Sequence, residues 1–552
     1  MWLLDEVRQR LLYGGRVFRR SPGFSAIVII AIGVGANSTI FGGIDSVLFK
    51  PLPHDDPDKL ASIQASCESL ASLTLPHTQI TRAQLVPAGA FAATPAGVLA
   101  PGAPSFRPYN TLPEFCRVTA TLAPSSDSDI KIEAWMPTSR WNGKFLGIGN
   151  GGWAGTISVQ ALAMALGRGY AVAATDTGHT SRDGSFAFNH PEKLIDFSYR
   201  AVHDMTVQAK ALVSAYYGKA PSASYWDGCS TGGRQGLKEA QRYPADYDGI
   251  IAGTPTNYMT HMLAQSLWVA HATLKDSTGY IPQEKYAAIH KAVLDACDSL
   301  DGVKDGVIDD PTRCHFDPKT IQCGADDAPT CLTAAQVEAA RKIYASVKNP
   351  RTGVEIFPGL EPGSELGWAG LAGGPNPMSI ATDYFKYIVF MDLAWDFRTF
   401  DFDKDVALAD SMDNGADNAT DPNLKAFFSR GGKLLMYHGW IDPLVAPRNS
   451  VNYYTSVANA LGGAANVNDS MRLFMVPGMG HCVGGDGPSN FDKLTVLEQW
   501  VEQKKAPDQI VASHIANGAV DRTRPLCPYP LVAIYSGTGS TNDAANFVCK
   551  AK

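Results

Sequence analysis

The sequence lacks long basic runs beyond its N-terminal region, and it lacks the cysteine and histidine spacings that are typical of zinc sites. Its 552 residues carry a formal net charge of −7. Because nucleic-acid binding requires concentrated lysine and arginine, this charge pattern argues against a nucleic-acid partner. The missing Cys-x-x-Cys and Cys/His clusters argue against structural zinc. There is no internal repeat, and a neutral or organic substrate fits the composition better than a nucleic acid.

Charged residues are scarce, at 18% of the chain, whereas 45% of the residues are hydrophobic. A chain of this length and composition forms a large core and at least one further domain. Its ten cysteines, an even number with several close pairs, favour disulfides and an oxidising compartment. The alternative is ten buried free thiols in a cytosolic protein. Spacing alone does not determine which cysteines pair.

An uncharged, apolar stretch follows three arginines near the N-terminus. Residues 23–44 contain no charged side chain and come after Arg16, Arg19 and Arg20. About 20 such residues span the hydrocarbon core of a bilayer, and basic residues stay on the cytoplasmic side. The stretch is long for a cleavable signal and lacks a clean cleavage site. We therefore expect an exported protein, periplasmic or extracellular, which this segment anchors in the membrane; a buried core helix is the alternative.

The whole N-terminal segment, residues 1–60, resembles the first membrane helix of the permease subunits of macrolide-exporter-type ABC transporters. Ser21–Phe24, Gly33–Asn37 and Lys50–Pro53 carry this resemblance. A lone permease helix cannot form a transporter. The resemblance therefore implies only that residues 1–60 are a membrane-targeting leader.

Predicted strands and helices alternate along most of the remaining chain. Such alternation predicts an α/β fold with a parallel, doubly wound sheet. This alternation of strands and helices stops after Thr256, which predicts a large inserted domain. The expected strands are 129–137, 143–148, 170–175, 248–253, 433–439 and 471–477, with a helix at 203–217. The expected domains are the leader (1–60), the first part of an α/β-hydrolase core (61–255), a lid domain (256–427) and the second part of the core (428–552).

The pentapeptide Gly228-Cys229-Ser230-Thr231-Gly232 has the Gly-x-Ser-x-Gly pattern of a nucleophile elbow. In this pattern a serine occupies a strand-to-helix turn that is too tight for larger flanking side chains, so its hydroxyl is exposed. A strand end precedes the motif and a helix over 234–240 is expected after it. A plain glycine-rich turn is the alternative reading.

Two later strands each end next to a residue that a nucleophilic serine requires. Asp442 follows strand 433–439, and His481 follows strand 471–477. The chain order Ser, Asp, His is that of an α/β-hydrolase. His481 would take the Ser230 proton, and Asp442 would orient and stabilise the imidazole. Because Cys229 and Cys482 adjoin the serine and the histidine, a disulfide between them is expected to hold the site together.

Backbone donors for the developing oxyanion are expected from two places. One is Thr231, directly after the nucleophile, and the other is Gly152 in the glycine-rich segment 149–153. A simple tight turn is the alternative for that segment. His179 and His203 are alternative bases, but a lone histidine is more often a hydrogen-bonded structural residue.

An acidic, glycine-containing loop at 297–310 is a candidate calcium site. Hard oxygen ligands in a flexible loop suit this ion. The loop is not an EF-hand because no glutamate stands at the twelfth position. A solvated acidic loop is the alternative, and no organic cofactor is expected. The proposed ligands are the carboxylates of Asp298, Asp301 and Asp305 with the carbonyls of Val303 and Val307.

The chain from Cys67 to the C-terminus resembles the tannase and feruloyl esterase family, which also includes bacterial mono(hydroxyethyl) terephthalate hydrolases. The resemblance lies in Cys229-Ser230, Asp442, His481-Cys482, the acidic loop and Trp395-Asp396-Phe397. It implies the catalytic triad named above, a lid domain with structural calcium, and a Cys229–Cys482 bridge. The other bridges that it implies are Cys67–Cys116, Cys297–Cys314, Cys323–Cys331 and Cys527–Cys549.

These features predict a serine carboxylesterase that cleaves small esters of aromatic acids, with feruloyl and other hydroxycinnamoyl esters first. Tannase activity on galloyl esters is the alternative, and hydrolysis of mono(hydroxyethyl) terephthalate is a third, with Lys386 as the partner of the free carboxylate. A noncatalytic, membrane-tethered binding protein is the alternative from another class. The sequence does not indicate an oligomeric state. Lid residues considered for ring stacking are Trp268, Tyr384, Phe385, Phe390 and Trp395.

Overall fold

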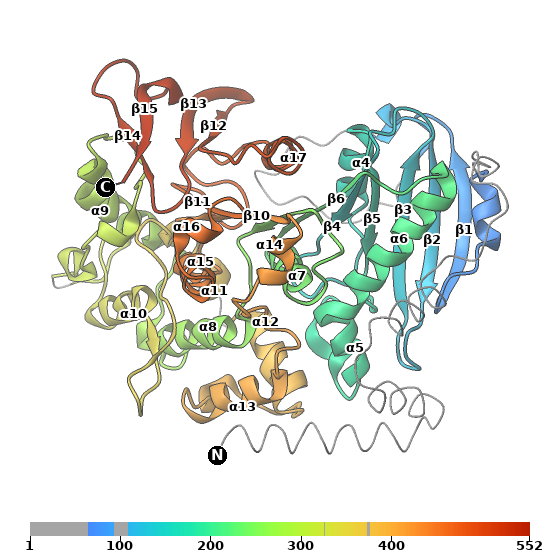
Figure 1. Cartoon of the computed structure of the whole chain (residues 1–552). Helices are drawn as coiled ribbons and strands as arrows, with labels where there is room; N and C mark the ends of the chain where they lie inside the picture. The colour runs from blue at the N-terminus through green and yellow to red at the C-terminus, as the bar shows by residue number, and fades with distance from the viewer. Residues whose placement is uncertain (1–64, 93–108, 325, 373–375, 552) are drawn as a thin grey trace, which may run out of the picture. The chain divides into compact units, whose positions relative to one another are not determined.

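A nine-stranded sheet positions the residues that the sequence singled out. The computed structural model describes residues 65–92, 109–324, 326–372 and 376–551. The strand order is β1-β2-β3-β5-β4-β6-β7-β10-β11, and Figure 1 shows these strands side by side. The strands are β1 (Thr78–Val86), β2 (Phe115–Leu122), β3 (Ile130–Pro137), β4 (Lys144–Ile148), β5 (Ala171–Thr175), β6 (Ala223–Cys229), β7 (Gly249–Gly253), β10 (Lys433–Gly439) and β11 (Met471–Val476).

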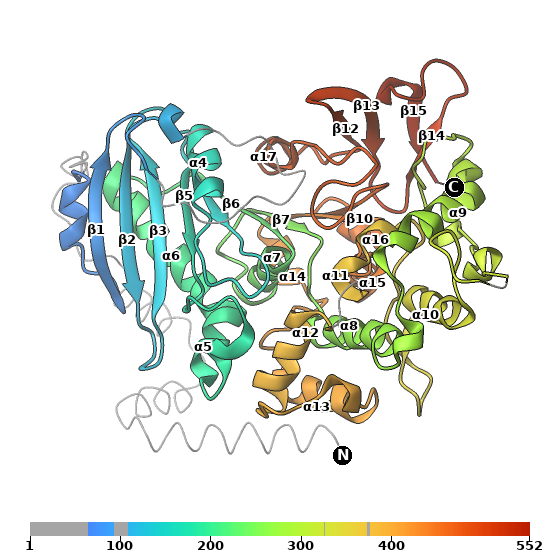
Figure 2. The same ribbon diagram turned by 180° about the vertical axis from the view of Figure 1, so that it is seen from behind.

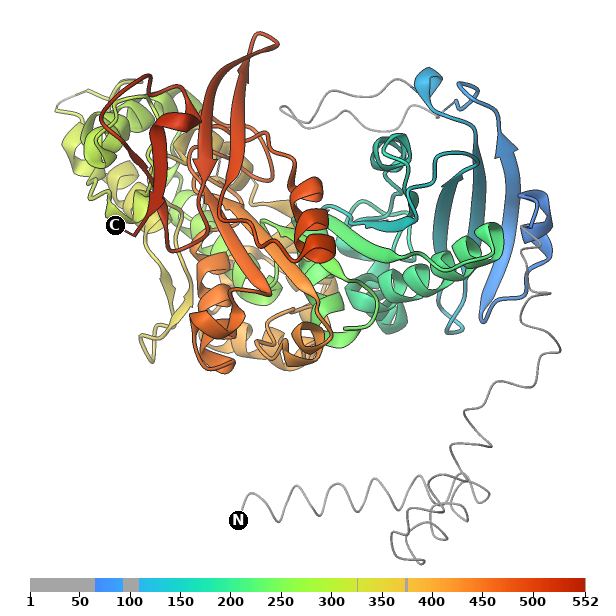
Figure 3. The same ribbon diagram turned by 45° about the horizontal axis from the view of Figure 1, so that its top comes forward.

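Six strands, from β5 through β11 in the sheet order, run parallel, as expected for an α/β fold. The first three, β1 to β3, are antiparallel, and β3 is also antiparallel to β5. The expectation of a wholly parallel sheet is therefore wrong at β3. Only residues 138–143 connect β3 to β4, and a parallel crossover needs a dozen residues or more. The colours in Figure 3 run across this sheet from blue at β1 to orange at β11.

Helices cover both faces of the parallel strands, and the side chains alternate between the two faces. In β10, Leu434 and Met436 pack in one apolar cluster, whereas Leu435 and Tyr437 pack in the other. The first cluster includes residues of α6 (Ala201–Tyr217), α7 (Thr231–Arg242), α14 (Lys425–Ser429) and α15 (Arg448–Ala460). The second includes residues of α4 (Val159–Gly167) and α17 (Lys493–Gln503).

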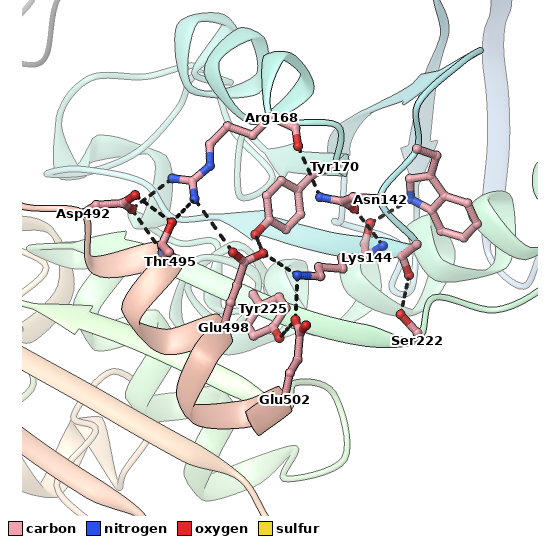
Figure 4. Close-up of polar contacts among 12 residues, drawn as sticks. Asn142, Lys144, Arg168, Tyr170, Ser222, Tyr225, Asp492, Thr495, Glu498 and Glu502 are labelled. Atoms are coloured by element: carbon pink, nitrogen blue, oxygen red, sulfur yellow. Dashed lines mark hydrogen bonds and ion pairs between the residues drawn. The ribbon is translucent and has the colours of Figure 1, made fainter. Parts of the chain in front are cut away.

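A polar network ties α17 to the starts of β4 and β6 (Figure 4). Lys144 lies 2.8 Å from Glu498 and 2.6 Å from Glu502, and the Tyr225 hydroxyl donates to Glu502 at 2.6 Å. The Tyr170 hydroxyl donates to Glu498. The carboxylates of Glu498 and Glu502 are thus each paired with a cation or a hydroxyl, and these contacts attach α17 to the sheet.

The chain between β7 and β10 forms a mainly helical segment with its own apolar cluster. Residues of α8, α9, α10 and α13 contribute to it, and Figure 2 shows α8 to α10 gathered beside β10. Val445 and Trp153 of the surrounding loops belong to the same cluster. Its elements are α8 (Met259–Thr273), α9 (Tyr286–Cys297), α10 (Ala334–Tyr344), β8 (Val347–Lys348), β9 (Glu355–Phe357), α11 (Ala369–Ala372), α12 (Ser379–Asp383) and α13 (Lys404–Asp413).

Two small hairpins complete the C-terminal part: β12 (Ile510–Ala516) pairs with β13 (Ala519–Leu526), and β14 (Val532–Tyr535) pairs with β15 (Phe547–Lys550). The remaining α-helices of the described residues are α5 (Pro191–Ile195) and α16 (Ala464–Val467). The structure joins all ten cysteines in the five pairs that the resemblance implied. Disulfides persist in oxidising compartments, so these bridges indicate an exported protein.

The predicted membrane segment, residues 23–44, lies outside the described residues, as does the rest of the leader (1–60). Within the ranges that are described, no helix combines the length and the hydropathy that crossing a bilayer requires.

Candidate active site

Ser230 occupies the turn between β6 and α7 in a strained backbone conformation. Its φ is 62° and its ψ is −122°, a region that residues with a Cβ rarely adopt. A Cβ on Gly228 would lie 2.3 Å from the carbonyl oxygen of Gly232, so no larger residue fits at position 228. This is the geometry of a nucleophile elbow.

The Asp442 and His481 side chains meet beyond the ends of β10 and β11. His481 Nδ1 donates to Asp442 Oδ2 at 2.9 Å, and the aspartate side chain is fully buried. Burial by itself would raise the pKa of Asp442, but the charge of His481 and the hydrogen bonds from His438 and His481 lower it below its ordinary value. Burial by itself would lower the pKa of His481, and Asp442 raises it instead. The pair is therefore arranged to accept a proton on the histidine.

His438 is a buried second partner of Asp442 that the sequence analysis did not single out. Its Nε2 donates to Asp442 Oδ2 at 3.2 Å and to the Val445 carbonyl at 3.1 Å, and its Nδ1 accepts from the Ser450 hydroxyl at 2.7 Å. The only sequence signal was its position four residues before Asp442, at the end of a strand that was already predicted.

The Cys229–Cys482 disulfide joins the segments that carry Ser230 and His481. Its Cα atoms lie 6.0 Å apart, although 253 residues separate the cysteines in the chain. Ser230 follows one cysteine and His481 precedes the other. On a chain-entropy estimate, a crosslink over so long a loop stabilises the fold by about 5 kcal/mol. The bridge therefore holds the serine and histidine segments together as well as stabilising the core.

Ser230 and His481 line one cavity of about 380 Å³ together with both predicted oxyanion residues, Gly152 and Thr231. Thr231 is the first residue of α7, where backbone N–H groups have no partner within the helix. Its hydroxyl donates to the Gly152 carbonyl at 2.8 Å, which joins the two segments. A serine, a histidine and two backbone donor positions thus face one space.

The remaining wall of this cavity is apolar. Its other lining residues are Gly151, Cys229, Thr256, Met259, Met262, Met378, Ile380, Leu444, Val445, Cys482 and Val483. None of the five aromatic residues that the sequence analysis considered for stacking lines it. Tyr384 and Phe385, for example, are buried in the apolar cluster of the helical segment. No sequence pattern distinguished the methionines from ordinary core residues.

The two alternative histidines lie elsewhere. His179 Nε2 bonds the Trp153 carbonyl at 2.6 Å, its ring stacks on Phe186, and burial lowers its pKa to about 4. His203 lies 2.6 Å from Asp246. Neither lines the cavity that Ser230 lines.

The acidic loop closes on itself through its own carboxylates. Asp298 Oδ1 accepts from the backbone amides of Asp305 and Gly306, each at 3.1 Å, and Asp301 Oδ1 accepts from the Val303 amide at 2.9 Å. Arg524 of β13 forms an ion pair with Asp305. The Asp298 carboxylate is thus engaged in shaping the loop.

A small gap lies beside this loop. Asp301, Asp305 and Val307 line it together with Asp309, which the sequence analysis did not propose. Its volume of about 10 Å³ is close to the space of one water-sized sphere. The oxygen-rich lining suits a hard cation, although Arg524 also borders the gap.

Comparison with known proteins places the chain in a family. A sequence model described as "Tannase and feruloyl esterase" matches residues 116–550, well over half of the chain. The chain therefore belongs to the tannase and feruloyl esterase family. As a member of it, the protein is a carboxylic ester hydrolase.

Three relatives illustrate the extent of the similarity. An uncharacterized esterase of Xanthomonas campestris pv. campestris is 40% identical over 539 residues, covering 89% of this chain and 92% of that protein. A probable feruloyl esterase B-2 of Neosartorya fischeri is 34% identical over 515 residues, covering 89% and 96%. The crystal structure of feruloyl esterase B from Aspergillus oryzae superposes with a TM-score of 0.82 at 32% identity, covering 89% of this chain and all of that one. The family match begins at residue 116 and lends no support to the permease-like reading of residues 1–60.

Proposed function

We propose that the protein is a serine carboxylesterase that hydrolyses feruloyl and related aromatic-acid esters through an acyl-enzyme. The Asp442–His481 hydrogen bond beside the cavity that Ser230 lines carries this proposal. The names of the relatives support the feruloyl substrate. The apolar, methionine-rich wall of the cavity suits an aromatic ring.

In the proposed reaction the Ser230 oxygen attacks the ester carbonyl carbon while its proton passes to His481 Nε2. The carbonyl oxygen becomes negative and accepts hydrogen bonds from the backbone amides of Thr231 and Gly152. Collapse of this intermediate breaks the bond to the alcohol, which leaves with the proton from His481. A water molecule then repeats the sequence and releases the acid.

The segment 256–427 is proposed as the lid over a core made of residues 61–255 and 428–552. Thr256, Met259, Met262, Met378 and Ile380 of this segment line the catalytic cavity, so it forms much of the acyl pocket. Among the described residues, no lysine or arginine lines the cavity, and Lys386 is not one of its lining residues. The free carboxylate of a terephthalate monoester would thus have no cationic partner there, which favours feruloyl and galloyl esters over it.

The test is replacement of Ser230. We expect Ser230→Ala to lower kcat on a chromogenic feruloyl ester by roughly 10⁶-fold, because no other group in the cavity replaces the nucleophile. The matched control is Ser222→Ala, directly before the start of β6, which should retain full activity. Turnover that survives in Ser230→Ala would refute the assignment of the nucleophile. Lack of turnover in the parent protein would favour a binding protein with an idle site.

We further propose that the loop 297–310 holds a structural calcium ion, with Asp301, Asp305 and the Val307 carbonyl at the gap and Asp309 as an added ligand. A ligand that binds only the folded state raises its stability. We therefore expect EGTA to lower the Tm of the parent protein and to leave that of Asp301→Asn unchanged. Asp295→Asn, an exposed change on α9, should respond like the parent. A parent Tm indifferent to EGTA would show that Arg524 alone neutralises the loop.

The proposed compartment is the periplasm or the extracellular space. The five disulfides support export. Anchoring by residues 23–44 stays a prediction, which membrane fractionation of the full chain would check.

A further inference from the structure

A second histidine–carboxylate cluster lies at the opposite end of α7 from Ser230. His203 comes from α6, Glu239 from the last turn of α7, and Asp246 from the loop before β7. Each offers one donor atom, and these atoms all lie within 4.8 Å of one another. At about 1.5 Å per residue, Glu239 is roughly 13 Å along the helix from the nucleophile. The cluster is thus separate from the catalytic cavity.

Glu239 distinguishes this cluster from an ordinary surface pair. Its side chain is buried, with 1% of the residue exposed. Among the described residues, no hydrogen-bond donor reaches either of its carboxylate oxygens. Its neighbour is the Asp246 carboxylate, with which it can form a hydrogen bond only if one of the two is protonated. Buried carboxylates in proteins are paired with a donor or a cation, or they coordinate a metal.

The cations near Glu239 are already engaged. The Lys210 ammonium donates to the backbone carbonyl of Asp246, and it lies 5.4 Å from the centroid of the Tyr247 ring. It therefore attracts Glu239 only through space. Asp204 on α6 adds a further negative charge that acts on Glu239. The negative charges of Asp246 and Asp204 thus outnumber the one lysine charge that acts on Glu239, and a bound cation would offset them.

The histidine is held so that it can act as a ligand. Its ring stacks on Tyr243 at a centroid distance of 3.7 Å, and its Nδ1 lies 2.6 Å from Asp246 Oδ2. The His203 side chain is 28% exposed and that of Asp246 is 14% exposed, which leaves solvent access to one side of the cluster. An imidazole nitrogen favours transition metals over calcium or magnesium, which prefer oxygen.

We propose that His203, Glu239 and Asp246 bind one divalent transition-metal ion of the zinc class, with water as the fourth ligand. Nitrogen and oxygen ligands lie about 2.0–2.2 Å from zinc, which separates tetrahedral ligand atoms by roughly 3.3 Å. The ligand atoms of the cluster lie within 4.8 Å of one another, so a bound ion requires their side chains to adjust to this spacing. The ion joins the C-terminal end of the nucleophile helix to α6 and to the loop before β7. It takes no part in ester hydrolysis, so the proposal does not depend on the function proposed above.

The test is zinc binding by the full chain. The protein is stripped with EDTA, returned to excess Ca²⁺ so that the acidic loop is saturated, and titrated with ZnCl₂ by calorimetry while Tm is followed in parallel. All ten cysteines are in disulfides, so no thiol competes for zinc. We expect one Zn²⁺ per chain and a rise in Tm that Mg²⁺ does not produce. Glu239→Gln preserves the shape of the side chain and should weaken zinc binding at least tenfold.

A second variant and a matched control complete the test. His203→Asn should weaken zinc binding like Glu239→Gln, with folding of both variants checked by near-ultraviolet circular dichroism. His514→Gln alters an exposed pair whose Nδ1 lies 2.7 Å from Asp521 but which has no buried third carboxylate, so it should bind zinc like the parent. Absence of zinc binding by the parent would show that Glu239 and Asp246 share a proton instead. Binding that Glu239→Gln leaves unchanged would place the ion elsewhere, for example at His481, and would also overturn the proposal.

Discussion

Two histidine–carboxylate clusters in this molecule use the same residue types in opposite surroundings. At the proposed catalytic end, Asp442 Oδ1 accepts from the amides of Leu444 and Val445, and Oδ2 accepts from His438 and His481. At the far end of α7, the equally buried Glu239 receives no donor from the described residues. A fully bonded carboxylate stays ionised and orients a histidine, whereas a carboxylate without donors needs a proton or a metal ion. The surroundings, more than the residue type, decide what each cluster does.

Among changes to the carboxylate and its donors, removing the charge of Asp442 should have the largest effect. Asp442→Asn keeps the shape of the side chain but cannot stabilise the imidazolium of His481, so we expect kcat to fall by about 10⁴-fold. Steady-state kinetics on a feruloyl ester would measure this. Asp521→Asn, in the exposed His514 pair, is the matched control and should leave kcat unchanged. A loss smaller than tenfold in Asp442→Asn would mean that Asp442 does not support His481.

The pH dependence of activity tests the pairing of His481 with Asp442. His481 must be neutral to accept the Ser230 proton, and Asp442 raises its pKa above the ordinary value of about 6.5. Activity is therefore lost as the pH falls through this raised pKa, and kcat/KM of the parent should be half-maximal above pH 6.5. In Asp442→Asn the charge of Asp442 no longer raises the pKa of His481, whereas burial still lowers it. The acidic limb of the residual activity should therefore move below pH 6.5. Coincident limbs in the two proteins would contradict the pairing.

His438 should contribute least, because it acts through Asp442. His438→Leu removes one of four donors to the carboxylate, and we expect kcat to fall about tenfold with little change in KM. His438→Gln can still place a donor near Asp442 and should recover most of the loss. Equal losses of kcat in the two variants would indicate that the hydrogen bond from His438 to Asp442 does not support catalysis, and a matching fall in Tm would assign the effect to packing.

Much of the candidate active site could be predicted from the sequence because its residues follow recognisable strand ends. A glycine pair around Ser230 and two apolar strands that end near Asp442 and His481 are local patterns with a direct steric or packing cause. The antiparallel β1 and β2 were missed, and β3 was given the wrong direction. Strand direction depends on which strands pair, and that is a long-range choice.

Local sequence patterns did not identify the residues that surround the site. His438 reads as an ordinary strand residue until the fold brings it to Asp442. Met259 and Met378 read as core positions, yet they line the cavity, while the aromatic residues expected there are packed in the helical segment. Periodicity identifies a buried face of an element, but it does not say what lies on the other side of that face.

By itself the sequence determined the family, the α/β class, the likeness of Ser230, Asp442 and His481 to a triad, and the export that ten cysteines favour, because each depends on a short motif or on composition. Only the tertiary structure decided that Asp442 has four donors while Glu239 receives none from the described part of the chain, and that a methionine-lined cavity adjoins the serine. Such contacts join segments that lie far apart in the chain, and their free energies depend on burial and distance, which exist only after the chain has folded.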